Sequence, residues 1–266
     1  MGLLIIRLIT FLNSQPPEST NYHIATIMLK NYEQVQASSI GQIAELCNVS
    51  KSTISKFARQ LGFDDYYDLK DNAAFIENRF NNPLNYLSNI LTPIAQEGVD
   101  TYVQAVIKDI HSLHEQLNLT DIDNVAKALH AYEDVVAFGL MFSESAAIDM
   151  QYKLAYNGKF IRTFQDDVIQ EQFLKEASDQ TLVIIFTNSG DYLTKQQIKL
   201  GTPRKDLFSK TKAKIIVISA NPSVRDLDFV SDAVIFPHQT TYQTHAIIYQ
   251  MITDLIVSRY RALSED

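Results

Sequence analysis

Cysteine is almost absent from this chain: Cys47 is the only one among 266 residues. A single cysteine excludes an internal disulfide and any cysteine-rich zinc site, and it fits a reducing cytoplasm. The sequence also lacks a G-x-S-x-G nucleophile elbow, a P-loop and a Rossmann G-x-G-x-x-G fingerprint. It therefore carries none of those catalytic or nucleotide-binding signatures.

Long apolar runs are missing as well. The N-terminal stretch, residues 1–12, is apolar, but Arg7 interrupts it and no small-residue cleavage site follows. The stretch is too short to span a bilayer, so we expect no membrane contact. We predict an amphipathic helix that packs on its own domain or on a partner subunit.

Positive charge is in deficit, because the net charge is −8. This balance argues against a protein that coats nucleic acid nonspecifically. The charge is uneven: residues 1–80 hold 7 basic and 8 acidic side chains, whereas residues 81–266 hold 16 and 23. A near-neutral N-terminal part can bind DNA locally through one basic helix. The length fits one large domain or two ordinary ones, and the composition is that of a soluble globular protein.

Residues 40–62 predict two short helices around a tight turn. Asn48 falls where the turn needs a positive φ, which asparagine tolerates better than most residues. Ser50 is a good N-cap for the second helix, and Gly62 stands where a helix commonly ends. Apolar residues at spacings of three and four give the second helix an inward face. They are Ile54, Phe57, Ala58 and Leu61. This is the pattern of a helix-turn-helix.

The outward face of that second helix is basic, rich in hydroxyls and free of acids. Lysine and arginine suit DNA phosphates, and serine, threonine, glutamine and arginine can reach base edges in a major groove. The candidate DNA-binding residues are Ser50, Lys51, Ser52, Thr53, Ser55, Lys56, Arg59 and Gln60. The alternative is a solvated helical hairpin in an all-α domain. The turn residue, the cap and the acid-free face favour double-stranded DNA as the partner.

The all-α domain is predicted to cover residues 1–80. Residues 18–30 form a support helix ahead of the motif, and a further helix follows it, beginning with acids that suit a helix N-terminus. An Asn-Asn-Pro sequence then marks a boundary. Residues 81–118 are expected to form a helical connector, and residues 119–266 a second domain.

In the second domain, strands alternate with helices. Near-continuous apolar strands separated by helices imply a parallel sheet covered on both faces. Strands are expected at residues 134–140, 159–163, 181–186, 214–219 and 233–236. Helices are expected at residues 121–131 (capped by Thr120), 143–156, 168–176, 205–212 and 240–261.

Two loops that follow strands are candidate ligand-binding segments, residues 139–145 and 187–191. In open α/β sheets, ligands bind beyond the carboxyl ends of the strands. Hydroxyls and free backbone N–H groups at a helix start suit a phosphate or another anion. The candidate ligand-binding residues are Ser143, Ser145, Thr187, Ser189 and Gly190. The alternative for each loop is simple helix capping.

No catalytic or metal-binding constellation stands out. The acid/base candidates are Glu144, Glu171 and His238, and no spacing singles them out. His238 and His245 flank the start of the last helix, and His111 and His114 lie three residues apart, but no further ligand follows at metal-binding spacing. We expect no metal, no cofactor and no catalytic residue.

Together the two halves resemble the RpiR (MurR/RpiR) family of bacterial transcriptional regulators, which join a helix-turn-helix to a sugar-isomerase (SIS) domain. The family's pattern has a Gly-Val-Ser turn, then LGF and DLK, and this chain has Asn-Val-Ser, Leu-Gly-Phe and Asp-Leu-Lys in those places. The family's ligand loops usually run G-x-G-x-S and S-x-S-G-x-T. Here Met141 replaces the second glycine and Tyr192 the last threonine. Met141 is expected to crowd a phosphate that approaches the backbone.

The resemblance implies an all-α helix-turn-helix domain followed by an α/β SIS domain with a parallel sheet flanked by helices. It implies a cytoplasmic, non-enzymatic regulator that binds a (pseudo)palindromic operator as a homodimer or higher homo-oligomer. The SIS domain would sense a phosphorylated sugar and thereby control carbohydrate-metabolism genes. Two alternatives stay open: a sugar-phosphate isomerase with an accessory helical head, and a DNA-binding regulator whose SIS domain only oligomerises.

Overall fold

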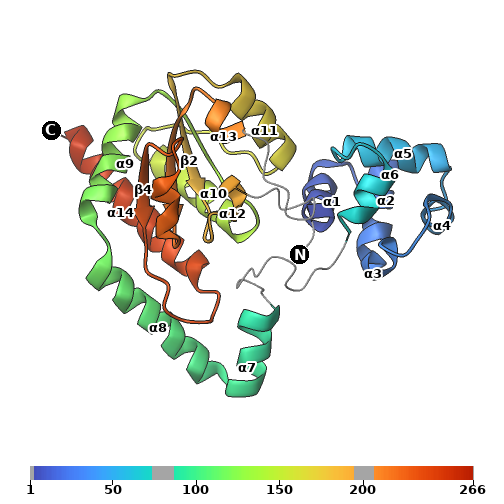
Figure 1. Ribbon diagram of the computed structural model, residues 1–266, viewed down its shortest axis with the longest axis horizontal. Coiled ribbons are helices and arrows are strands. Elements are labelled where there is room, and N and C mark those ends of the chain that lie inside the picture. Colours follow the sequence, from blue (N-terminus) through green and yellow to red (C-terminus); the bar gives the residue numbers. More distant parts are fainter. Residues whose placement is uncertain (1–2, 74–86, 195–206, 266) are drawn as a thin grey trace. The chain divides into compact units, whose positions relative to one another are not determined.

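The computed structural model of the chain describes residues 3–73, 87–194 and 207–265. Its contacts divide the chain into two compact units, the first holding Met1–Asn81 and the second the rest of the described chain. Each unit is described by itself (Figure 1). The finer division into residues 1–80, 81–118 and 119–266 stays a prediction.

Over residues 3–73 the regular elements of the first unit are all helices, as predicted. Its helices are α1 (Leu3–Ser14), α2 (Thr20–Lys30), α3 (Tyr32–Val35), α4 (Ile40–Leu46), α5 (Lys51–Gln60) and α6 (Tyr66–Asp71). Short polar side chains fix four of the helix starts, because each accepts a hydrogen bond from the backbone N–H three residues on. They are Ser19, Ser39, Ser50 and Asp65. The predicted continuation of the last helix to residue 80 lies outside the described residues.

Helix α1 packs on its own domain, which confirms the amphipathic helix predicted at the N-terminus. Leu4 and Leu8 are fully buried. Arg7 donates a hydrogen bond from Nη1 to the carbonyl oxygen of Gly62 at 2.8 Å, and its guanidinium lies 4.6 Å from the ring centre of Phe63. The charge that interrupts the apolar run therefore caps the end of α5.

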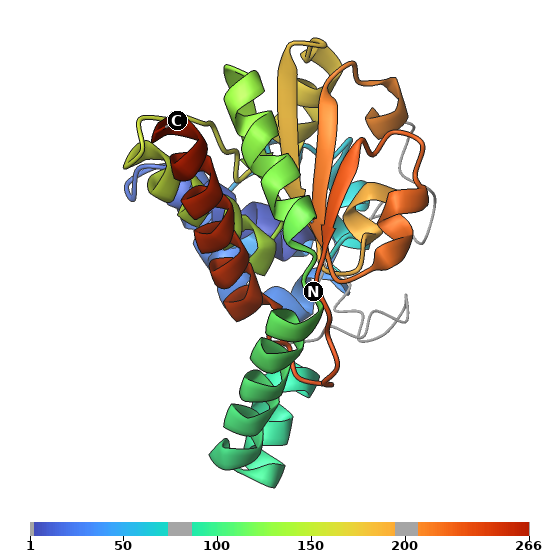
Figure 2. The same ribbon diagram turned by 90° about the vertical axis from the view of Figure 1, so that its left-hand side faces the viewer.

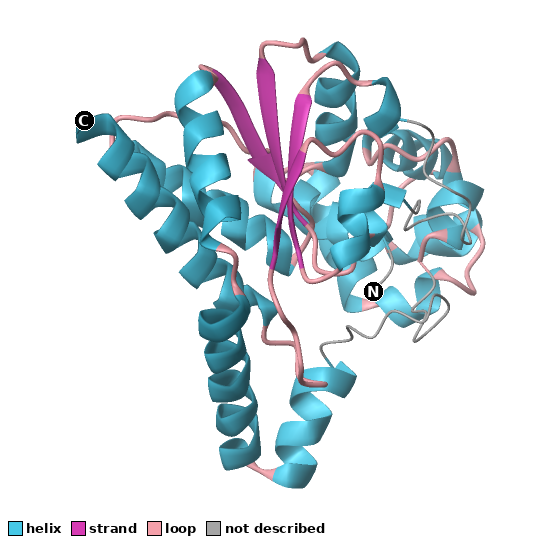
Figure 3. Ribbon diagram, turned by 60° about the vertical axis from the view of Figure 1, so that its left-hand side comes forward, coloured by secondary structure: helices cyan, strands magenta, loops and turns pink. Residues whose placement is uncertain are grey.

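The second unit begins with a helical segment. A π-helical stretch η1 (Leu87–Leu91) leads into α7 (Thr92–Glu97), and Gly98 turns the chain into α8 (Val99–Gln116) and then α9 (Leu119–Ala131). Gly98 has φ +89°, a conformation that favours glycine. In Figure 3 the two helices α7 and α8 run side by side as an arm that projects beyond the sheet.

The sheet is four-stranded and parallel in the order β1-β2-β3-β4, which confirms the predicted α/β class. The strands are β1 (Asp134–Phe138), β2 (Thr181–Phe186), β3 (Lys214–Ser219) and β4 (Asp232–Ile235). The remaining elements are α10 (Phe142–Ala155), α11 (Asp167–Glu176), α12 (Asp191–Thr194), α13 (Leu207–Lys210), the 3₁₀ turn η2 (Pro222–Asp226) and α14 (His245–Glu265).

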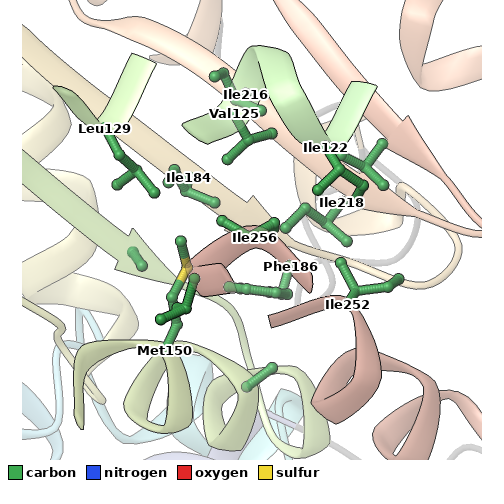
Figure 4. Packing of buried hydrophobic residues seen from close by; sticks show 14 of the residues in the cluster. Ile122, Val125, Leu129, Met150, Ile184, Phe186, Ile216, Ile218, Ile252 and Ile256 are labelled. Atoms are coloured by element: carbon green, nitrogen blue, oxygen red, sulfur yellow. The ribbon is translucent and has the colours of Figure 1, made fainter. Parts of the chain in front are cut away.

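Two separate cores cover the two faces of the sheet. On one face, side chains of α9, α10 and α14 pack on alternate strand residues such as Ile184 and Ile218, as Figure 4 shows. On the other, α11, α12 and α13 pack on the intervening residues, such as Val183 and Val217. Figure 2 shows α9 and α14 together on the first face. Both faces are buried, which explains why the strands are apolar at every position.

Three predictions for individual elements of the second unit were wrong. Residues 159–163 do not form a strand: Arg162 makes a single bridge to Val136, and of the two apolar residues before it Ile161 is buried whereas Phe160 is 78% exposed. Thr120 does not cap its helix, since the side chain of Asn118 accepts the hydrogen bond from the N–H of Thr120 and the helix starts at Leu119, two residues before the predicted start. The last helix begins at His245, not at residue 240.

Candidate functional site

The turn of the helix-turn-helix has the predicted geometry. Asn48 has φ +52° and Gly62 has φ +79°, so each stands where a positive φ is needed. Cys47 is fully buried, and burial raises the pKa of its thiol to about 11. Cys47 is therefore an unreactive core residue. The four predicted inward residues of α5 are at most 4% exposed, which fixes the opposite side of α5 as its outward face.

The outward face of α5 presents three side chains of the predicted set as one exposed stripe. Ser52, Lys56 and Arg59 are exposed and lie at spacings of four and three. Lys51 and Gln60 are exposed beside them. No acid lies on α5, so no carboxylate of this helix neutralises the positive charge of the stripe.

The hydroxyls at the start of α5 hydrogen-bond to one another. Ser50 Oγ lies 2.8 Å from both Ser52 Oγ and Thr53 Oγ1, and it accepts a bond from the Thr53 N–H at 3.1 Å. Thr53 and Ser55 are only half-exposed. Thus Ser50 and Thr53 shape the helix start, whereas the stripe of Ser52, Lys56 and Arg59 offers the free surface.

The first candidate ligand loop is packed onto the end of the neighbouring strand. A Cβ added at Gly139 would lie 2.7 Å from the Phe186 carbonyl oxygen and 2.8 Å from Ser143 Cβ, so only glycine fits there. Met141 has φ +56° and ψ −120°, a region that glycine adopts freely and other residues rarely do. The sequence has a bulky residue where the backbone is shaped for glycine.

The second candidate ligand loop is tied to the end of β3. Ser219 Oγ donates to the Asn188 carbonyl oxygen at 3.1 Å, and Asn221 Nδ2 donates to the Ser189 carbonyl oxygen at 2.8 Å. Gly190 has φ +80°, and a Cβ there would lie 2.9 Å from Val224 Cγ1. The ends of β1, β2 and β3 thus form one continuous edge. Ser219 and Asn221 were missed in the sequence analysis, although a Ser-x-Asn sequence that begins at the last residue of a strand was a usable signal.

The five predicted ligand-binding residues have different surroundings. Ser143 and Thr187 are 8% and 5% exposed. Ser189 is half-exposed, and its Oγ accepts a bond from the Asp191 N–H at 3.2 Å. Ser145 donates to the Phe142 carbonyl oxygen of its own helix at 2.7 Å, so it caps its own turn. That Ser143, Ser145, Thr187, Ser189 and Gly190 bind a ligand remains a proposal.

Tyr192 faces the core and not the loop edge. It is 2% exposed, and its ring lies edge-on to Phe138 and Phe208. Its hydroxyl donates to Oε1 of Gln170, a fully buried residue of α11. The replacement of threonine by tyrosine at this position therefore fills the second core.

The start of α14 places His245, which the sequence analysis considered only as a possible metal ligand, beside the first loop. His245 is 4% exposed and lies edge-on to Phe142 and to Tyr249. Burial, reinforced by the charge of His238, lowers the pKa of His245 to about 4. Among the described residues its Nδ1 has no hydrogen-bond partner. The site thus contains a neutral imidazole with one unused nitrogen.

A fully buried carboxylate holds the segment that leads to His245. Asp109 of α8 accepts hydrogen bonds from the Gln239 N–H at 3.0 Å and from Thr244 Oγ1 at 2.5 Å, and its Oδ2 lies 3.2 Å from His238 Nδ1. Burial alone would raise the pKa of Asp109, but these bonds outweigh it and lower the pKa to about 2. They also hold residues 238–244 out of the helix, which explains why α14 starts late.

The acid/base candidates from the sequence lie in separate networks. His238 pairs with Asp109, whereas Glu144 is half-buried and interacts with Gln165, and burial raises its pKa. Within the described ranges, no group of three or more His, Cys, Asp or Glu side chains could hold a metal ion. In the same ranges, no helix has the length and apolarity to cross a membrane.

Comparison with known proteins identifies the first unit. Residues 8–74 match the helix-turn-helix domain of the rpiR family, which confirms the predicted resemblance over that domain. The chain is 24% identical over 196 residues to an uncharacterised HTH-type transcriptional regulator of Providencia stuartii, covering 72% of this chain and 67% of that protein. It is also 24% identical over 172 residues to the HTH-type regulator HexR of Pseudomonas aeruginosa, where it spans only 58% of the relative's length and 63% of its own.

A solved structure shares the fold of nearly the whole chain. The Vibrio vulnificus NanR protein, complexed with ManNAc-6P, aligns with 98% of this chain and 92% of its own, with a TM-score of 0.51 and 13% identity. At this identity the likeness shows the fold: a helical N-terminal region followed by the α/β domain.

Proposed function

We propose that this chain, whose residues 8–74 form a helix-turn-helix domain of the rpiR family, is a cytoplasmic transcriptional regulator that responds to a phosphorylated sugar. The main support for the DNA-binding part of this proposal is the outward face of α5, which contains no acidic residue. The buried residues on the opposite side of α5 fix which face points outward. Lys56 and Arg59 contact phosphates, and Ser52 and Gln60 reach base edges in the major groove. Ser50 and Thr53 also shape the start of this helix, and Lys51 and Ser55 complete the proposed DNA-binding set.

The protein binds DNA as a homodimer or a higher homo-oligomer. A helix-turn-helix reads one half-site, and two half-sites about 34 Å apart present the same groove face to two copies. The net charge of −8 also favours binding by more than one copy, because one basic helix on an acidic protein supplies few phosphate contacts.

The effector site lies at the joined ends of β1, β2 and β3. Ser143, Thr187 and Ser189 supply hydroxyls there, Gly190 lets the chain pass close to Val224, and the start of α10 supplies backbone donors for an anion. NanR, which shares the fold, was solved with ManNAc-6P. A phosphorylated sugar is thus the ligand class that we propose, and carbohydrate-metabolism genes are the proposed targets.

The proposal assigns no catalytic turnover. Its support is that Glu144 and His238 hydrogen-bond in different networks, so they are not arranged as an acid/base pair. In the alternative function, the SIS domain only oligomerises and binds no sugar phosphate. One observation favours it: Met141 places a bulky side chain where the backbone has a conformation typical of glycine.

Selection of genomic DNA fragments by the full-length protein, followed by footprinting, tests the proposed DNA binding. We expect an inverted repeat with half-sites one helical turn apart. The Ser52→Ala/Lys56→Ala/Arg59→Ala variant should lose selection, whereas Lys175→Ala, an exposed change on α11, should not. Equal recovery of all fragments by the wild-type protein would contradict sequence-specific regulation.

A further inference from the structure

The segment between β4 and α14 contacts both the edge of the sheet that carries the candidate ligand loops and the arm formed by α7 and α8. We call residues 238–244 the strap; they form no helix or strand. Figure 1 shows this connection as the loop that runs from β4 to the arm and back to α14. The middle of the strap contacts the arm, whereas its two ends adjoin the sheet edge.

Hydrogen bonds hold the strap to both helices of the arm. Asp109 of α8 is fully buried and accepts bonds from Thr240 Oγ1 at 2.8 Å and from Thr244 Oγ1 at 2.5 Å. The hydroxyl of Tyr242 donates to Glu97 Oε2 of α7 at 2.9 Å. Two acidic side chains of the arm therefore bind the strap, one on each helix.

Apolar packing reinforces this attachment. Tyr242 is 5% exposed and packs with Ile90 and Ala105, and its ring centre lies 5.7 Å from that of Tyr102 on α8. A buried carboxylate that loses its hydrogen-bond donors is strongly unfavourable, so Asp109 resists separation from the strap. The strap and the adjoining part of the arm should therefore move together.

The two ends of the strap adjoin the two candidate ligand loops. Just before the strap, the Phe236 N–H donates to the carbonyl oxygen of Ser219 at 3.0 Å, and the hydroxyl of Ser219 in turn binds the second loop. Just after the strap, His245 lies edge-on to Phe142 of the first loop. A displacement of either loop therefore reaches the strap through direct neighbours.

Buried polar atoms at these two ends lack partners. His245 Nδ1 and Asn188 Oδ1 are buried, and neither has a hydrogen-bond partner among the described residues. Toward the arm, by contrast, the buried hydroxyls of Tyr242 and Thr244 are both bonded. Buried polar groups without partners are rare and unfavourable. The loop-side ends of the strap are thus the places where a polar ligand can add new bonds.

We propose that the strap couples the effector site to the arm: a phosphorylated sugar bound at the two loops shifts residues 238–244, and Asp109 carries that shift into α8. The arm follows the helix-turn-helix unit in the chain, so its position bears on how two DNA-binding units match the spacing of two half-sites. Asp109 is a positioning residue, because it acts through the strap. The inference rests on the proposed function for the ligand and for DNA binding.

The coupling ratio of the full-length protein tests the role of the strap. This ratio compares the operator dissociation constants with and without each member of a panel of hexose and pentose monophosphates that includes ManNAc-6P. For the wild-type protein we expect a ratio of about 5 to 150 for at least one of them. Thr244→Val keeps the shape of the side chain but removes the hydroxyl that binds Asp109, so the ratio should fall below about 2. The same sugar phosphate should still raise the melting temperature of this variant.

Matched variants separate coupling from general stability. Thr244→Ser keeps the hydroxyl and should keep the wild-type ratio. Thr253→Val removes another fully buried hydroxyl of α14, one that donates to Asp149 of α10 at 2.5 Å, and it should also keep that ratio. Tyr242→Phe removes only the bond to Glu97 and should lower the ratio, which provides a second test if Thr244→Val does not fold.

The possible failures are distinguishable. A wild-type ratio in folded Thr244→Val or Tyr242→Phe overturns this inference alone, and so does an equal loss of coupling in Thr253→Val. Loss of the melting-temperature rise in Thr244→Val overturns it too, because the strap would then act on ligand binding itself. A wild-type protein whose operator affinity no sugar phosphate changes overturns the proposed sensing function together with the inference.

Discussion

The hydroxyl of Tyr192 donates a hydrogen bond to Gln170 Oε1 at 2.5 Å, deep in the second core. Gln170 in turn donates from Nε2 to the carbonyl oxygen of Gly139 at 3.1 Å. One side chain of α11 therefore connects the first candidate ligand loop to Tyr192 of α12, the helix that begins at the last residue of the second loop. The residue that the sequence identifies as a bulky departure from the family pattern is a structural tie between these loops.

Removal of that tie should destabilise the second unit. Tyr192→Phe leaves the buried Gln170 Oε1 without its donor, so we expect the free energy of unfolding to fall by about 1–3 kcal/mol. Tyr156→Phe is the control, because Tyr156 is 92% exposed. Urea denaturation of both variants checks the prediction. Equal stability of the two variants would show that the buried bond contributes nothing.

The backbone at Met141 predicts an unusual gain from glycine. Met141→Gly relieves a positive φ, a strain of about 1–3 kcal/mol, which exceeds the roughly 0.5–1 kcal/mol entropic cost of glycine. We expect a higher melting temperature and tighter binding of sugar phosphates. Asn48→Gly is the control at the other non-glycine positive φ, where asparagine is already tolerated. A lower melting temperature for Met141→Gly would refute the assignment of strain.

His245 should make the fold sensitive to mild acid. Its pKa is about 4 in the folded protein and about 6.5 in an unfolded chain. Between these values the unfolded chain binds a proton that the folded protein does not, so stability falls as pH drops from about 6.5 to 4. The loss is on the order of 3 kcal/mol.

Urea midpoints measured across that pH range check the effect, and His245→Gln should flatten the profile there. Asp109 contributes at lower pH: its pKa is about 2 in the folded state, so the stability that it adds disappears only as pH falls below about 4. A profile for His245→Gln that is as steep as that of the wild-type protein would count against the buried, neutral imidazole.

The DNA-binding stripe predicts a specific salt response. If Lys56 and Arg59 each neutralise one phosphate, Lys56→Ala/Arg59→Ala should reduce the slope of log affinity against log salt by about 1.8. Lys175→Ala should not change it. Fluorescence anisotropy at several salt concentrations measures the slope, and an unchanged slope in a folded double variant would remove these residues from the interface.

Local signals made the helix-turn-helix predictable from sequence. The cap at Ser50, the positive φ at Asn48 and the inward spacing from Ile54 to Leu61 are properties of a few neighbouring residues. The parallel sheet was predictable because strands buried on both faces are continuously apolar. The fold class followed from these patterns, whereas the family was suggested by the resemblance of the Asn-Val-Ser, Leu-Gly-Phe and Asp-Leu-Lys sequences to the family's pattern.

Long-range contacts explain what the sequence did not reveal. Nothing in residues 238–244 shows that Asp109, about 130 positions earlier in the chain, holds them out of a helix. The position of His245 beside the first loop, and the role of Gln170 between the loops, depend on how distant helices pack. The separation of Glu144 from His238 likewise became visible only in three dimensions.

The most direct test of the central claim is the dissociation constant of the full-length protein for its selected operator, with and without sugar phosphates, ManNAc-6P among them. We predict that at least one sugar phosphate changes this constant by about 5- to 150-fold, the usual range of coupling between two sites. Ser189→Ala should abolish the change and leave the affinity without ligand intact. A constant that no sugar phosphate alters at millimolar concentration would contradict the account and leave the second unit as an assembly module.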